Sequence, residues 1–147
     1  SFFMIFKIKI MRKLLSTKYS AGAFNTAMLL TRLAFGGIMM YHGYEKLIGF
    51  STIKNSFMNF LGIGSTMSLA LVVFAEFFCA LFIVLGLFTR FAAIALLICM
   101  SVAFFMAHNG VIFGEKGGET ALLFLVGYTV LLLVGPGKIS VDSMIGK

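Results

Sequence analysis

Four long apolar runs dominate this sequence and constrain its fold more than any other feature. They cover Phe24–Tyr44, Met67–Leu87, Phe91–His108 and Glu119–Val134. About 20 apolar residues in a helix cross the hydrocarbon core of a bilayer, and backbone groups in lipid must pair within their own segment. The chain is 61% hydrophobic and only 12% charged, which is the composition of a membrane protein. The runs therefore predict an all-α membrane protein, an antiparallel four-helix transmembrane bundle.

The rest of the chain divides around this bundle. A basic N-terminal segment, 1–23, precedes the four spans of 24–134, and a tail, 135–147, follows them. In the loop Glu45–Thr66 apolar residues recur at helical spacing. This spacing predicts an amphipathic helix on the outer membrane surface or a segment that folds back over the bundle.

Residues 1–10 are apolar but too few to span a bilayer. They are interpreted either as an extension ahead of a more natural start at Met11 or as an interfacial anchor.

The basic residues indicate the orientation of the spans. The net charge is +7, and five basic residues precede the first apolar run. Eight lysines and arginines fall on the side of the termini and the 88–90 turn, against three on the other side: Lys46, Lys54 and Lys116. Because positive residues favour the cytoplasmic side, both termini are expected in the cytoplasm. The same distribution favours an orientation signal over nucleic-acid binding.

Two charged residues lie deep within apolar runs, Arg32 in the first and Glu76 in the second. An unpaired charge near the middle of a span costs about 2.5–3.5 kcal/mol, so each needs a partner. Similar depths on antiparallel helices predict an Arg32–Glu76 ion pair. This pair is interpreted either as a lock between two helices or as a site for an anion, a quinone or a proton. Gly36 and Gly43 share the Arg32 side of the helix and predict close helix packing.

A second polar group is predicted at the outer ends of the spans. It comprises His42, Lys46, His108 and Glu119. Such residues can bind metal or haem or pass protons, but hydrogen bonding of the helix ends is the simpler interpretation. No metal site is assigned.

The order of these residues resembles the DoxX family of small bacterial four-helix membrane proteins. The resemblance rests on "RLAFGGIMMYHGYEKL", "AEFFCALFIVLGLFTRFAA", "FFMAHNG" and "GGETALLFLVGYTVLLLVGPGKISVD", between Thr31 and Asp142. It implies a multi-pass protein of the bacterial inner membrane. The family name comes from a relative of a thiosulfate:quinone oxidoreductase subunit, and some members are associated with redox complexes.

Three functions follow from these observations. The favoured one is an accessory or scaffold subunit of a larger membrane complex, respiratory or redox, that is not an enzyme by itself. The first alternative is a quinone-linked oxidoreductase subunit of the thiosulfate:quinone type, with quinone as the candidate ligand and Arg32, Glu76, His42 and His108 around it. The second is a small anion or proton transporter. The expected partners are the lipid bilayer and other membrane subunits; a homo-oligomer is compatible with the sequence, and nucleic acid is not expected.

Overall fold

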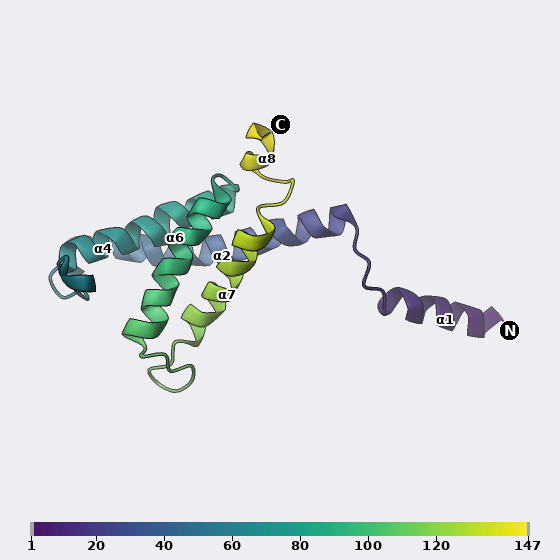
Figure 1. The fold of residues 1–147 in the computed structure, drawn as a ribbon, viewed down its shortest axis with the longest axis horizontal. Helices are drawn as coiled ribbons and strands as arrows, with labels where there is room; N and C mark the ends of the chain where they lie inside the picture. Colours follow the sequence, from purple (N-terminus) through teal and green to yellow (C-terminus); the bar gives the residue numbers. More distant parts are fainter. Residues whose placement is uncertain (1, 147) are drawn as a thin grey trace.

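The computed structural model describes residues 2–146, and within that range the chain is helical without β-strands. Its long helices form two antiparallel hairpins, with shorter helices at the ends and in the outer loop (Figure 1). In chain order the elements are α1 (Phe2–Leu14), α2 (Ala21–Ile48), α3 (Phe50–Ile53), η1 (Phe60–Gly62), α4 (Ser65–Val73), η2 (Phe74–Cys79), α5 (Ala80–Leu85), α6 (Thr89–Val102), η3 (Ala103–Ala107), α7 (Glu119–Val134) and α8 (Val141–Ile145).

The first hairpin pairs α2 with a composite helix made of α4, η2 and α5. Ser20 starts α2, because its side chain accepts a hydrogen bond from the backbone N–H of Ala23 and so satisfies a free donor of the first turn. The composite helix ends at Gly86, whose φ of 68° lies in the left-handed region that glycine tolerates best. In its middle, η2 is a π-helical turn, which widens the helix locally.

The second hairpin consists of α6 with its π-helical extension η3, followed by α7. It lies across the first hairpin (Figure 1), and α6 packs against both α7 and η2. Gly127 allows α7 to approach α2, because a Cβ there would lie only 2.3 Å from the ring of Phe35. Next to it the buried hydroxyl of Tyr128 donates to the carbonyl oxygen of Phe35 at 3.1 Å. These contacts join the two hairpins in one core.

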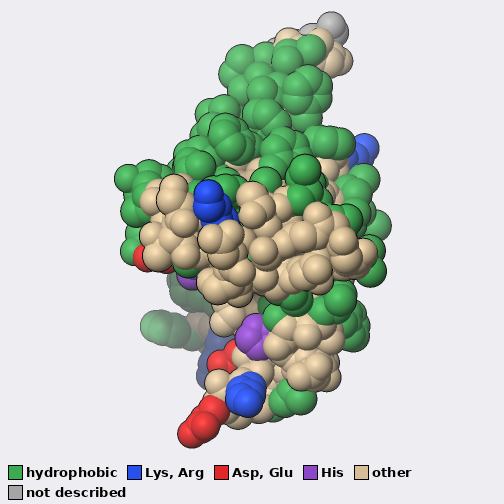
Figure 2. All heavy atoms as spheres, turned by 90° about the vertical axis from the view of Figure 1, so that its left-hand side faces the viewer, with side chains coloured by type: hydrophobic (Ala, Val, Ile, Leu, Met, Phe, Trp, Pro, Cys, Tyr) green, Lys and Arg blue, Asp and Glu red, His purple; other side chains and the backbone are tan. Residues whose placement is uncertain are grey.

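The predicted membrane protein is confirmed by the lengths and compositions of the helices. Ala21–Ile48, Ser65–Leu85 and Thr89–Ala107 are each long and apolar enough to cross a membrane. The fourth predicted span, Glu119–Val134, forms a shorter apolar helix of 16 residues. Large apolar side chains are exposed along all four, and we interpret them as the contact with lipid tails. Figure 2 shows the end of the molecule that carries the loop after α2, where polar groups, charged side chains and histidine lie in the middle and lower part and hydrophobic side chains lie above and around them.

The outer loop differs from the single amphipathic helix that its pattern predicts. The helix α2 continues to Ile48, and between it and α4 only the short α3 and η1 form. Leu61, Gly62 and Gly64 have positive φ angles of 49°, 76° and 98°, which no regular helix accommodates. The segment therefore turns back over the bundle instead of lying along the membrane as one helix.

The C-terminal residues 135–146, here called the C-terminal strap, also return to the bundle. The backbone N–H of Asp142 donates to the carbonyl oxygen of Gly86 at 2.8 Å, next to the α5–α6 turn. Asn25 accepts a hydrogen bond from the backbone N–H of Lys138 at 2.9 Å. The strap thus connects the start of α2 to the turn between α5 and α6.

Candidate functional site

Glu76 occupies the π-helical turn η2, in the middle of the second span. A π turn places one extra residue in the helix and often marks a functional position. The Glu76 side chain is only 8% exposed. A carboxylate with so little access to water needs a charged or hydrogen-bonding partner in order to stay ionised.

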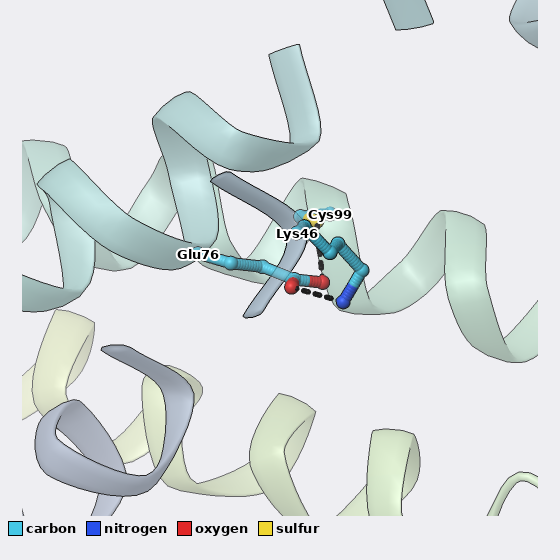
Figure 3. A network of polar contacts seen from close by, with 3 residues as sticks. All are labelled: Lys46, Glu76 and Cys99. Atoms are coloured by element: carbon cyan, nitrogen blue, oxygen red, sulfur yellow. Dashed lines mark hydrogen bonds and ion pairs between the residues drawn. The ribbon is translucent and has the colours of Figure 1, made fainter. Parts of the chain in front are cut away.

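Lys46, in the last turn of α2, provides that partner. Its Nζ lies 2.6 Å from Glu76 Oε2, a charge-assisted hydrogen bond that Figure 3 shows together with the neighbouring thiol. The other carboxylate oxygen, Oε1, faces the Sγ of Cys99 on α6 at 4.0 Å, a weak contact. The Lys46 side chain is 29% exposed, so the pair extends from the outer surface into the interior.

Two glycines of α2 allow the helix to lie close to the second span, Gly43 at the π turn and Gly36 at α5. At Gly43 a Cβ would lie 2.4 Å from the backbone nitrogen of Phe77 and 2.5 Å from the carbonyl carbon of Glu76. At Gly36 it would lie 2.8 Å from a methyl group of Val84. Backbone cannot move aside as a flexible side chain can, so Gly43 in particular sets the distance between Lys46 and Glu76.

An apolar pocket lies between the second and third spans, next to the loop that follows α2. It has a volume of about 230 Å³, and Phe57 and Phe60 of the outer loop form part of its lining. Its wall includes Ala75, which precedes Glu76 in the sequence, and Cys99, whose thiol lies near the Glu76 carboxylate. Cys99 thus lies next to the Glu76 carboxylate and also lines the pocket.

The predicted Arg32–Glu76 ion pair is not formed. Arg32 is 1% exposed, and its Nη2 donates to the carbonyl oxygen of Ile139 in the C-terminal strap at 2.7 Å. Arg32 lies against Gly86, at the end of the second span, whereas Glu76 lies at the level of Gly43. Gly43 is 11 residues, or about 16 Å, further along α2 than Arg32. The guanidinium and the carboxylate are thus at different depths.

The predicted outer cluster is not one site either. Lys46 pairs with Glu76, while His108 Nδ1 lies 2.9 Å from the carbonyl oxygen of Lys116 and so holds the α6–α7 loop. His42 lies against Tyr41, and Glu119 is exposed at the start of α7. Among residues 2–146, no group of three His, Cys, Asp or Glu side chains is arranged to hold a metal ion.

Asp142 has a structural role that its place near the end of the sequence did not reveal. Its two carboxylate oxygens accept the backbone N–H groups of Phe88 and Thr89 at 2.7 and 2.9 Å, which caps the start of α6. Partial burial raises the pKa of Asp142, but these hydrogen bonds and the positive charge of Arg32 outweigh that effect and hold it below its usual value. No local pattern signals this cap, because Asp142 lies 53 residues from Thr89 in the sequence.

Comparisons with known proteins place this chain in a family. An uncharacterized protein of Haemophilus influenzae is 34% identical over 67 residues, which cover 44% of this chain and 44% of that protein. No solved structure matches the chain. The model of the DoxX family matches residues 27–109, a range that contains Arg32, Lys46, Glu76 and Cys99. The predicted resemblance is thereby confirmed, and the chain belongs to the DoxX family.

Proposed function

We propose that this protein is an accessory subunit of a membrane redox complex and supplies a binding site for a quinone. The observation that carries the proposal is the position of the Glu76 carboxylate. One oxygen is bonded to the partly exposed Lys46, and the other faces Cys99 on the wall of an apolar pocket. A quinone combines an apolar ring and chain with carbonyl oxygens that exchange protons, so it needs both features at one place.

Glu76 and Lys46 connect the pocket with the outer surface. The Lys46 side chain is 29% exposed and the Glu76 side chain 8%, so solvent exposure decreases from Lys46 at the surface to Glu76 in the interior. A carboxylate within hydrogen-bond reach of a reacting group can take up and release protons. In this proposal Glu76 passes protons between Lys46 and a quinone oxygen at the Cys99 end of the pocket.

The reaction balances only with a second subunit. Reduction of a quinone to a quinol takes up two electrons and two protons. Glu76 delivers the protons from the outer side, and a thiosulfate-oxidising partner delivers the electrons as two thiosulfate ions join to form tetrathionate. This division of labour accounts for an accessory rather than an independently catalytic chain.

Binding of decylubiquinone to the purified protein in lipid nanodiscs tests the site. Ala95 lines the pocket, so Ala95→Phe should fill it and abolish saturable binding. Glu119→Gln changes an exposed carboxylate elsewhere and is the matched control for Glu76→Gln. In the natively purified complex, Glu76→Gln should lower thiosulfate-dependent quinol formation about 100-fold or more, whereas Glu119→Gln should not. Equal quinone binding by the wild type and Ala95→Phe, or a native preparation without any co-purifying protein, would contradict the proposal.

The same proposal places the protein in the bacterial inner membrane with both termini in the cytoplasm. It is supported by the excess of lysine and arginine on the side of the termini and the α5–α6 turn. Alkaline phosphatase folds only outside the cytoplasm, so a fusion after Ile145 should be inactive and a fusion within the 109–118 loop should be active. The reverse pattern would overturn the orientation.

A further inference from the structure

The helix α1 has no role in the bundle or in the candidate site. None of its residues is buried, and it extends away from the start of α2 (Figure 1). It nevertheless carries many large apolar side chains, which makes an entirely water-exposed position unfavourable. A surface of this kind needs a partner, and the character of the helix indicates which one.

The basic residues of α1 give this surface a strong positive charge. Lys9, Arg12 and Lys13 recur at the i, i+3 and i+4 spacing that places side chains on one side of a helix. The segment also contains Lys7, and no acidic residue occurs before Glu45. A partner of complementary character must therefore be negatively charged.

Four of the apolar residues follow a second side of the same helix. Phe3, Phe6, Ile10 and Leu14 are spaced by three or four residues and form a continuous strip. The 13 residues of α1 extend about 20 Å as a helix, which is too short for the hydrocarbon core of about 30 Å. A short helix with an apolar strip and a basic side is suited to lie in the plane of a membrane interface.

The connection to α2 keeps α1 at that interface. Residues 15–20 separate the end of α1 from the start of α2, which enters the membrane. Six residues extend over no more than about 21 Å, so α1 cannot move far from the bilayer surface. We propose that α1 is an interfacial anchor that binds the anionic phospholipid headgroups of the membrane in which the protein is embedded. This proposal does not depend on the proposed quinone site.

Tryptophan fluorescence of the full-length protein in liposomes tests the anchor. The chain contains no tryptophan, so a single Phe6→Trp substitution in the apolar strip provides a probe without background. In liposomes that contain phosphatidylglycerol, its emission should shift to shorter wavelength and be quenched by brominated lipid tails. Both effects should weaken in pure phosphatidylcholine and in high salt. Ile5→Trp, one residue away on the basic side, should be more exposed in every condition.

Removal of the charges separates recognition of anionic lipid from simple burial of the apolar strip. Lys9→Gln, Arg12→Gln and Lys13→Gln in the Phe6→Trp background should each lower the ratio of docked to free helix by about fivefold. The matched control removes three positive charges elsewhere, at Lys54, Lys116 and Lys138, and should leave the signal unchanged. Emission that is the same in both lipids and insensitive to salt and to the α1 substitutions would overturn the proposal.

Discussion

Removal of Lys46 while Glu76 remains should destabilise the protein more than removal of both charges together. Lys46→Met leaves a carboxylate that is 8% exposed without its ion pair. Breaking a fully buried pair costs about 3–5 kcal/mol, and the 29% exposure of the Lys46 side chain reduces this to about 2–3 kcal/mol in the free energy of unfolding.

The converse substitution should cost less. Glu76→Gln keeps the shape of the side chain, and the long, partly exposed Lys46 can turn its ammonium group outwards. We expect a loss of about 1 kcal/mol, comparable to one hydrogen bond. The double variant contains no buried charge at this position. Its loss in the free energy of unfolding should therefore be about 1.5 kcal/mol smaller than the sum of the losses of the two single variants.

Reversible unfolding in mixed micelles of detergent and SDS, followed by far-ultraviolet circular dichroism, measures these free energies. Lys54→Met removes a lysine of the outer loop that lies outside the pair and serves as the matched control. If Lys46→Met resembles Lys54→Met, or if the two single effects add without coupling, the ion pair does not stabilise the fold and our reasoning is wrong.

Three further substitutions test the close contacts of the structure. Gly43→Ala should destabilise the protein by at least about 2 kcal/mol in the same assay, because its Cβ would meet the backbone of Phe77. Gly86→Ala should free the C-terminal strap and increase its proteolysis, because its Cβ would collide with the Arg32 guanidinium at a positive φ. Asp142→Asn should have a similar but weaker effect. Folding lowers the pKa of Asp142, so its stabilising contribution is complete above about pH 4 and is lost as the pH falls through the pKa of the folded state. Proteolysis of the strap at a series of pH values measures this dependence, and Asp142→Asn should lack it.

The fold could be predicted from the sequence because hydrophobic length alone determines a membrane helix. The predicted span Glu119–Val134 coincides with α7, and the predicted Phe24–Tyr44 lies within the longer α2. The outer loop was less predictable. Its apolar residues do recur at helical spacing. The positive φ angles at Leu61 and Gly62, however, depend on how the loop folds over the bundle, and no local sequence pattern specifies that fold.

The candidate site was predictable in its residues but not in their pairing. Arg32, Lys46 and Glu76 each stand out in the sequence, but similar depths predict the wrong pair. That prediction holds only if both spans are regular helices that begin at the same level and if the C-terminal residues make no contact with them. Arg32 instead lies level with Gly86, so α2 begins 11 residues before the level at which the second span ends, and the strap returns to Arg32.

The buried Arg32 and the partly exposed Lys46 differ in what surrounds them, and this difference agrees with a structural role for Arg32 and with the proposed proton transfer at Lys46. Arg32 donates to the backbone of the strap, and Gly86 leaves so little room that a single added carbon would meet the guanidinium. No ligand can reach a group enclosed in this way unless the strap leaves first. Lys46 instead joins the exposed surface to Glu76, whose second oxygen is directed at the pocket wall. An arginine, which keeps its charge at all working pH values, is suited to a permanent lock, whereas a lysine and a carboxylate can exchange protons. The residue types at the two sites therefore match the roles that their surroundings permit.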